Sequence, residues 1–190
     1  MTTGRPTGPT IPLAQTPESA LDVLMPEERS AVLAAVLTTH PDLVEDAEVA
    51  ARELLTAATI EGVATDVSSV LGLIPLEDLG ARAGRVQGRG YVHETDAAGE
   101  LVRENVEPFF ADMRRRASLG LMDAAAVVAA GIVAGLYRVR DPEGGTVLAY
   151  AGPDVPGELA DDLMTEARRL GVVIADDVHD RLWPRWADLA

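Results

Sequence analysis

The chain has 190 residues, 47% of them hydrophobic, and a formal net charge of −15 at pH 7. That length is enough for one domain with a hydrophobic core or for two small ones. The negative charge disfavours nucleic acid and anionic membranes as partners, because both repel it, and it favours a basic partner protein. The sequence has no cysteine, and all 16 basic residues are arginine, so disulfides, thiolate sites and lysine Schiff bases are excluded.

The first residues, MTTGRPTGPTIPLAQ, are polar and rich in proline and glycine. They contain no apolar run of the kind found in signal peptides, and they predict a disordered leader over residues 1–15. A first helix is expected to begin next, with Thr16 as its N-cap and Pro17 in its first turn. We therefore expect one helical domain over residues 16–190, in a cytoplasmic protein.

Two further helices are predicted where a proline precedes acidic residues. Pro26 opens PEERSAVLAAVLTTH, and Pro41 opens PDLVEDAEVAARELLTAA. The acidic residues that follow each proline suit the positive end of a helix. The second segment carries an apolar stripe at helical spacing, made of Leu43, Ala47, Ala50 and Leu54.

The segment TIEGVATDVSSVLGLI is rich in β-branched residues, which favour a strand. Its apolar residues nevertheless recur at steps of three and four, and this period predicts a helix. The apolar positions are Ile60, Val63, Val67, Val70 and Ile74. A short helix is expected to follow from Pro75 and to end at Gly84.

A long helix is predicted over TDAAGELVRENVEPFFADMRRRASLG, with Thr95 as its cap. Pro108 lies inside it and is expected to kink or split it. Its core stripe is expected to consist of Val102, Val106, Phe109, Met113 and Ala117. The arginines at 114–116 are expected to complement the negative end of this helix.

The segment MDAAAVVAAGIVAGLYRV is apolar on every side, which predicts the central buried helix of a bundle. Its uncharged run is shorter than the ~20 residues that cross a bilayer. Val128 and Ile132 are expected to be buried. Gly131 and Gly135 are expected to let a neighbouring helix approach closely.

Further on, DPEGG predicts a turn, and TVLAY is a candidate strand that would pair back on YRVR, giving one short hairpin near 137–150. PGELADDLMTEARRLG predicts an amphipathic helix closed by Gly171. A last helix is expected to begin at Asp176. It would carry both tryptophans, Trp183 and Trp186.

Together these elements predict an all-α fold, either an irregular helical bundle or stacked helical hairpins of the HEAT or armadillo kind. The pattern of proline-opened helices in an alanine- and arginine-rich, lysine-free chain resembles uncharacterised all-helical, HEAT-like proteins of high-GC bacteria. This resemblance implies no activity. High-GC coding is the first explanation for the missing lysines, and avoidance of lysine-directed modification is the alternative.

The stretch GRVQGRGYVHET, residues 84–95, interrupts the helical pattern. Its glycine spacing matches neither the dinucleotide fingerprint nor the Walker loop. His93 and Glu94 have no further metal ligand at helical spacing. Two interpretations carry equal weight: a partner-docking loop, because loops often carry recognition, or a self-packed connector whose arginines bridge acidic helices.

The predicted function is a non-catalytic protein–protein interaction or scaffold module, without cofactor, metal or catalytic residues. Aromatic and arginine side chains dominate the energy of many interfaces, and the expected partner-binding residues are Arg85, Arg89, Tyr91, Trp183 and Trp186. One alternative is an acidic inhibitor or immunity-type protein that masks a basic partner. Another is a small-anion or metal-dependent enzyme that uses the 84–95 loop. A homo-oligomer is left open.

Overall fold

The computed structural model describes residues 19–86, 88, 90–142 and 144–174. Within them it has seven α-helices, two 3-10 helices and one two-stranded antiparallel sheet, which confirms the predicted all-α fold. The chain divides into two compact units, Met1–Val49 and Ala50–Ala190, where the sequence predicted one domain over 16–190. We call them the N-terminal and the C-terminal unit.

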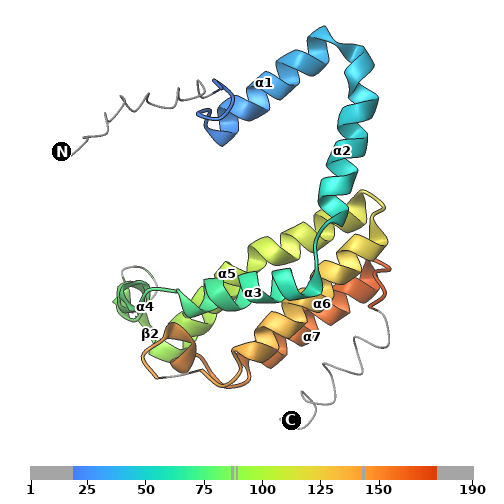
Figure 1. Cartoon of the computed structure of the whole chain (residues 1–190). Helices are drawn as coiled ribbons and strands as arrows, with labels where there is room; N and C mark the ends of the chain where they lie inside the picture. Colours follow the sequence, from blue (N-terminus) through green and yellow to red (C-terminus); the bar gives the residue numbers. More distant parts are fainter. Residues whose placement is uncertain (1–18, 87, 89, 143, 175–190) are drawn as a thin grey trace, which may run out of the picture. The chain divides into compact units, whose positions relative to one another are not determined.

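The N-terminal unit contains α1 (Pro26–Thr39), the 3-10 turn η1 (Pro41–Leu43) and the beginning of α2 (Val44–Thr56) (Figure 1). The helices lie where the prolines predicted them. At the start of α1, the Met25 backbone N–H donates to the Glu28 carboxylate at 2.8 Å. None of the described residues of this unit is buried.

The helix predicted to begin at Thr16 is wrong over its described part. Residues 16–18 lie outside the described residues, and the chain from Ser19 to Asp22 is a turn. Ser19 accepts the Asp22 backbone N–H at 2.9 Å, while the Asp22 carboxylate accepts the Ser19 N–H at 3.2 Å. Short polar side chains that bond to nearby backbone groups in this way compete with helix formation.

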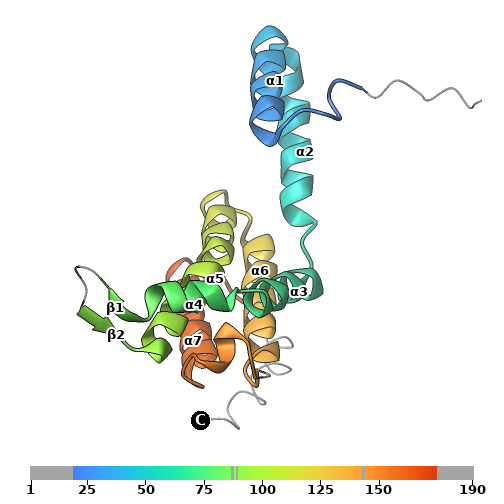
Figure 2. The ribbon, with the colours of Figure 1, turned by 90° about the vertical axis from the view of Figure 1, so that its left-hand side faces the viewer.

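The C-terminal unit is built around a central helix, as Figures 1 and 2 show. The central helix α6 (Met122–Arg138) packs against α3 (Ile60–Gly72), α5 (Glu94–Ser118) and α7 (Val155–Arg169). A short helix, α4 (Leu76–Arg82), leads into β1 (Gly84–Val86) and β2 (Gly90–Val92). A second 3-10 turn, η2 (Val147–Ala149), lies between α6 and α7.

The core of this unit surrounds α6. Val128 and Ile132 are buried, as predicted. Gly131 and Gly135 face α3 at very short range, because a methyl group on Gly135 would lie 2.6 Å from the Val67 Cβ and one on Gly131 2.5 Å from the Val63 Cβ. The two glycines therefore allow the close approach that the sequence predicted.

The prediction of a helix over the β-branched segment at 60–72 is confirmed. The Thr59 hydroxyl accepts the Gly62 N–H at 3.1 Å and caps α3. Helical periodicity therefore outweighs strand propensity here, because the helix buries Ala64, Val67 and Leu71 against the rest of the core.

The predicted hairpin near 137–150 is wrong. Tyr137 and Arg138 remain in α6, and 147–149 is the η2 turn, whose Val147 and Leu148 are buried in the core. The described hairpin lies at 84–92 instead. Glycines with positive φ occur there at Gly84, Gly88 and Gly90, a conformation that glycine adopts without steric cost.

The long helix α5 is continuous through Pro108, so it is not split. Its cap is His93 and not Thr95, because the His93 Nδ1 accepts the Thr95 backbone N–H at 3.3 Å. The predicted stripe is buried except at Phe109, where the neighbouring Phe110 is the more deeply buried ring.

The three arginines near the end of α5 make specific bonds beyond complementing the helix end. Arg114 joins Glu107 and Glu166. Arg115 and Arg116 both pair with Asp112, at 2.5 and 2.9 Å. Arg116 is the buried member of the three, and it also donates to the Leu55 carbonyl in the last turn of α2, where helix carbonyls have no partner within the helix.

Of the described helices, none taken singly has both the length and the apolar content to cross a membrane. The bent pair of Pro41–Thr56 and Ile60–Gly72 meets that test only when its two segments are taken together.

Candidate partner-binding groove

The structure brings together two of the five predicted partner-binding residues. Arg85 and Tyr91 are directly opposite each other in the β1–β2 ladder. Opposite residues of an antiparallel pair project from the same face of the ribbon. Both are exposed, Tyr91 at 73% of its surface. Arg89, Trp183 and Trp186 lie outside the described residues.

The hairpin is held to the helices at its base. Arg82, at the end of α4, donates to the Glu104 carboxylate of α5 at 2.7 Å. This hydrogen bond raises the pKa of the Arg82 guanidinium. Arg82 precedes the 84–95 stretch, and its bond joins α4 to the acidic helix α5. This bond links the end of α4, next to the hairpin that carries Tyr91, to α5, so the connector and docking interpretations are compatible.

Beside Tyr91 lies an open groove of about 590 Å³, which we call the Tyr91 groove. One wall is a single face of α5, because its residues recur at steps of three and four along the helix. The other wall comes from the loop before α7 and its first turns. The lining residues are Tyr91 and Val92 from β2, Thr95, Asp96, Gly99, Glu100 and Arg103 from α5, and Gly152, Val155 and Glu158 from the α7 side.

Small residues set the depth of this groove. Gly99 is buried, and a methyl group there would lie 3.3 Å from a guanidinium nitrogen of Arg103 and 3.8 Å from Val155. A methyl group on Gly152 would lie 4.0 Å from Thr95 and 3.9 Å from Val155. Larger side chains at these two positions would fill the space between the walls.

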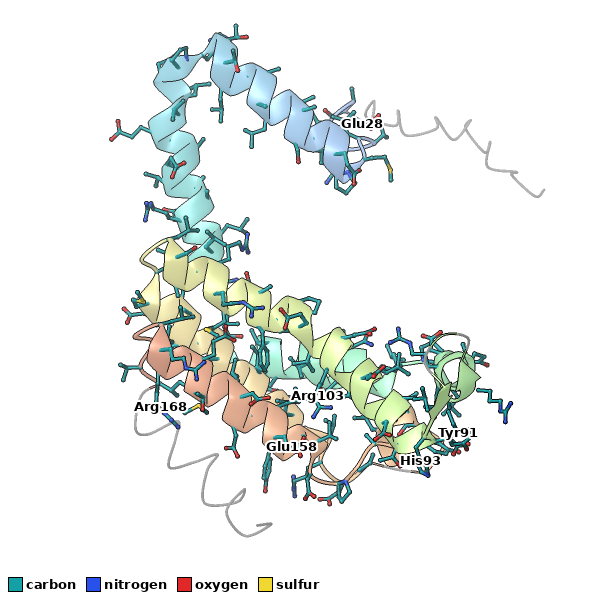
Figure 3. All side chains as sticks on the ribbon, turned by 180° about the vertical axis from the view of Figure 1, so that it is seen from behind. Glu28, Tyr91, His93, Arg103, Glu158 and Arg168 are labelled. Atoms are coloured by element: carbon teal, nitrogen blue, oxygen red, sulfur yellow. The ribbon has the colours of Figure 1, made fainter. Side chains whose placement is uncertain are left out.

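The groove is acidic. Asp96, Glu100 and Glu158 contribute three carboxylates and Arg103 one guanidinium. Arg103 donates to Glu158 at 2.7 Å and joins the two walls. Figure 3 shows this pair on facing elements, with Tyr91 and His93 together at the hairpin end. Asp96 adds a further carboxylate to the described lining, which favours a cationic group over a small anion.

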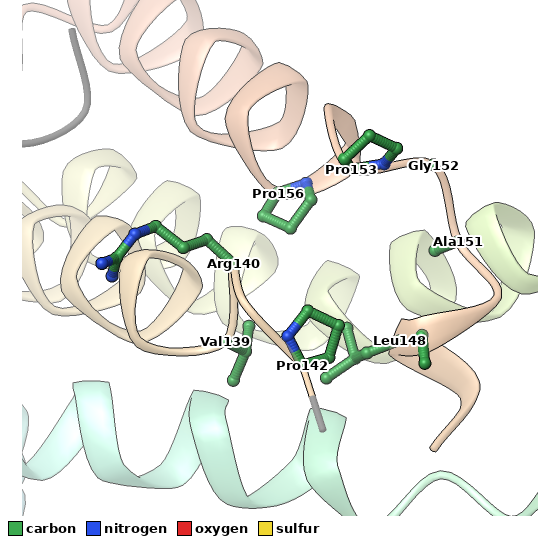
Figure 4. Close-up of a pocket in the computed structure, with 9 residues that line it drawn as sticks. Val139, Arg140, Pro142, Leu148, Ala151, Gly152, Pro153 and Pro156 are labelled. Carbon is green, nitrogen blue, oxygen red and sulfur yellow. The ribbon is translucent and has the colours of Figure 1, made fainter. Parts of the chain in front are cut away.

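A smaller cavity of about 230 Å³ lies between the end of α6 and the beginning of α7 (Figure 4). Its lining is mostly aliphatic, including Pro142, Leu148 and Pro156. The Arg140 guanidinium points away from it, as Figure 4 shows, and lies 3.8 Å from the centre of the Tyr137 ring. The described residues around this cavity therefore offer mainly apolar contact.

Among residues 19–174, apart from the three masked positions, no three His, Cys, Asp or Glu side chains gather as they would around a metal ion. His93, the histidine of the 84–95 stretch, uses its Nδ1 to cap α5. One ring nitrogen of His93 thus has a structural role at the start of α5.

The acidic walls were not predicted. Asp96, Glu100 and Arg103 share one face of the long helix, and that spacing is visible in TDAAGELVR. Their partner Glu158 is distant in sequence and meets them only through the packing of α5 and α7. Helical spacing in the sequence could have indicated the α5 wall. No sequence feature near Glu158 indicated that α7 would form the other wall.

No family model, no curated protein and no solved structure matches this chain.

Proposed function

We propose that the chain is a non-catalytic, cytoplasmic interaction module that binds a basic segment of a partner protein in the Tyr91 groove. The supporting observation is a tyrosine, Tyr91, that is 73% exposed beside a groove whose described lining residues include three acidic side chains and one arginine. Exposed tyrosines are frequent anchors in interfaces, because the ring buries a large area at a small cost in conformational entropy.

The groove suits an arginine- or lysine-bearing segment. Asp96 would pair with a cationic head, while Tyr91 and the aliphatic Val92 and Val155 would accept the stems of long side chains. The net charge of −15 would speed the encounter with a basic partner. Arg85 shares a ribbon face with Tyr91 and is proposed as a second contact at the rim.

A narrower candidate is an acidic inhibitor or immunity-type protein that masks the basic site of a nucleic-acid enzyme. The same charge and the same acidic groove favour it. The two candidates differ in the partner, because only a nucleic-acid enzyme would lose activity when the chain binds.

A photo-crosslinking amino acid at position 91 tests the proposal in the native host. Tyr150 is the matched control, since it is an exposed tyrosine that does not line the groove. We expect a partner crosslinked from position 91 and not from position 150, with a yield that falls as salt rises. Equal crosslinking from both positions would contradict the proposal.

Two substitutions then locate the binding energy. Tyr91→Ala is expected to weaken capture of the crosslinked partner by about tenfold or more. Asp96→Asn should weaken it less and reduce its salt dependence. Tyr150→Ala should leave capture unchanged. Undiminished capture by Tyr91→Ala would move the binding surface away from this groove.

A further inference from the structure

The helix α1 is apolar on every side over two turns. Residues 31–37 read AVLAAVL, without a polar side chain among them. Helices with this pattern are found in protein cores, as α6 is in the C-terminal unit. Yet no residue of α1 is buried within its own unit, where its main neighbour among the described elements is the η1 turn.

The described part of the N-terminal unit is therefore unusually rich in uncovered apolar side chains. Nine large hydrophobic residues are exposed among residues 19–49, compared with ten in the described part of the C-terminal unit, which is several times longer. Short helices without a buried face are marginal in water, because packing supplies most of their stability. The helix needs a partner surface to remain folded.

The charges on α1 indicate what that surface is. They are confined to the first turn, at Glu27, Glu28 and Arg29, and the chain is uncharged from Ser30 to Pro41. A basic partner would therefore meet no carboxylate along the apolar turns. A second α1 running antiparallel would place each charged first turn beside the uncharged end of the other, whereas a parallel copy would bring Glu27 and Glu28 close to their equivalents.

From this pattern we infer that the protein forms a homodimer in which two α1 helices pack antiparallel across residues 31–37. Val32, Leu33 and Val36 form the central contact, because they lie one, three or four positions apart on one side of the helix. Leu43 and Val44, also exposed, extend the surface beyond α1. A stable interface buries about 800 Å² on each copy, so both regions are required. This inference is independent of the Tyr91 groove.

Sedimentation velocity on the full chain, over a wide range of concentrations, tests the dimer. Val36→Asp is expected to raise the dissociation constant about 30-fold or more, because it places a charge in an apolar interface. Val70→Asp is the matched control. Val36 and Val70 are 39% and 37% exposed, and both lie in the last turn of a helix, but Val70 belongs to the C-terminal unit. The control should dimerise like the wild type.

Disulfide trapping tests the orientation, and the cysteine-free sequence provides a clean background. Leu33 is near the middle of α1, so Leu33→Cys is expected to form a disulfide-linked dimer under mild oxidation. Glu27→Cys should not, because in an antiparallel pair the two positions are about 18 Å apart along the axis. Val70→Cys again serves as the control.

Three results would overturn the inference. The first is a wild-type chain that stays monomeric at every concentration, with α1 amides protected from hydrogen exchange by another part of the same chain. The second is a dimer that survives Val36→Asp but dissociates in Val70→Asp. The third is efficient trapping through Glu27→Cys instead of Leu33→Cys, which would require a parallel pair. Leu33→Cys keeps the helix apolar, so this readout remains valid if Val36→Asp impairs folding.

Discussion

The helices α1 and α6 have the same kind of sequence and different surroundings. Residues 31–37 of α1 and most of α6 are apolar on every side, but α6 is covered by α3, α5 and α7, whereas α1 has no residue buried within its own unit. The described core residues belong to the C-terminal unit, and none of the described residues of the N-terminal unit is buried within that unit. An all-round apolar pattern thus shows that a helix requires cover, and it does not show whether the same chain supplies it.

The difference has a local cause in α6. Gly131 and Gly135 let α3 come within van der Waals range of the α6 backbone, and this contact extends along the helix. The apolar stretch of α1 has alanines but no glycine, and no helix of its own unit lies along it. Each of the following changes tests whether the free energy of unfolding comes mainly from the core of the C-terminal unit.

The largest effect is expected for Ile132→Asp, because Ile132 is fully buried in α6. An unpaired charge in the core should lower the free energy of unfolding by about 4 kcal/mol or more. Chemical denaturation followed by circular dichroism measures this loss. In contrast, Val36→Asp should leave the unfolding of the C-terminal unit unchanged. Equal losses from both would show that the two units share one core.

The next effect concerns Arg116, which is 8% exposed and bonds to Asp112 and to the Leu55 carbonyl. Arg116→Ala leaves both acceptors without this donor and should cost about 2–3 kcal/mol. Arg115→Ala is the control. Arg115 pairs with the same carboxylate, but its side chain is 60% exposed, so its loss should cost less than about 0.5 kcal/mol. Similar losses of unfolding free energy in the two variants would contradict the conclusion that the buried bonds of Arg116 stabilise the fold.

A smaller effect is expected at Gly135. Gly135→Ala would place a methyl group 2.9 Å from the Ala64 carbonyl oxygen as well as against Val67, so α3 must shift, at a cost of about 1–3 kcal/mol. Gly80→Ala in α4 has no atom within 4 Å and should stabilise that helix, by up to about 1 kcal/mol. Opposite signs for the two glycines would confirm the close contact of α3 and α6.

The smallest effect depends on pH. Burial by itself raises the pKa of Asp112, but hydrogen bonds from Arg115 and Arg116 outweigh it and hold the pKa below the ordinary 3.8. Because the pKa is lowered in the folded state, the stabilisation is complete above about pH 3.8 and is lost as the pH falls through the lower folded value. Asp112→Asn should therefore cost about 1 kcal/mol at neutral pH and less in strong acid. Exposed Asp66→Asn should change stability little at either pH.

Much of the C-terminal unit could be predicted from its periodicity. Helical spacing identified α3 against its β-branched composition, and the glycine pair in α6 indicated a close helix contact. The wrong predictions fall where local hydrogen bonds or burial decided the structure against the pattern of residue types in the sequence. Val147 and Leu148 are buried in a 3-10 turn instead of a strand, and the 84–92 region pairs as a hairpin through its glycines.

The site was predicted only in part. Arg85 and Tyr91 were chosen for their residue type, and strand pairing places them opposite each other. The acidic groove beside them was missed, because its walls are 55 positions apart at the Arg103–Glu158 pair. A pairing over that separation depends on how α5 and α7 pack, which neither segment encodes by itself.

The sequence by itself determined that the chain is acidic, cysteine-free and helical, since charge and hydrophobic period are local properties. It also determined that α1 and α6 both need apolar cover. Only the tertiary structure decided that α6 obtains this cover within its own unit, and that Tyr91 borders a groove with carboxylates from two helices. The reason is physical: burial and electrostatic environment arise from contacts between distant segments, and those contacts exist only once the segments have packed.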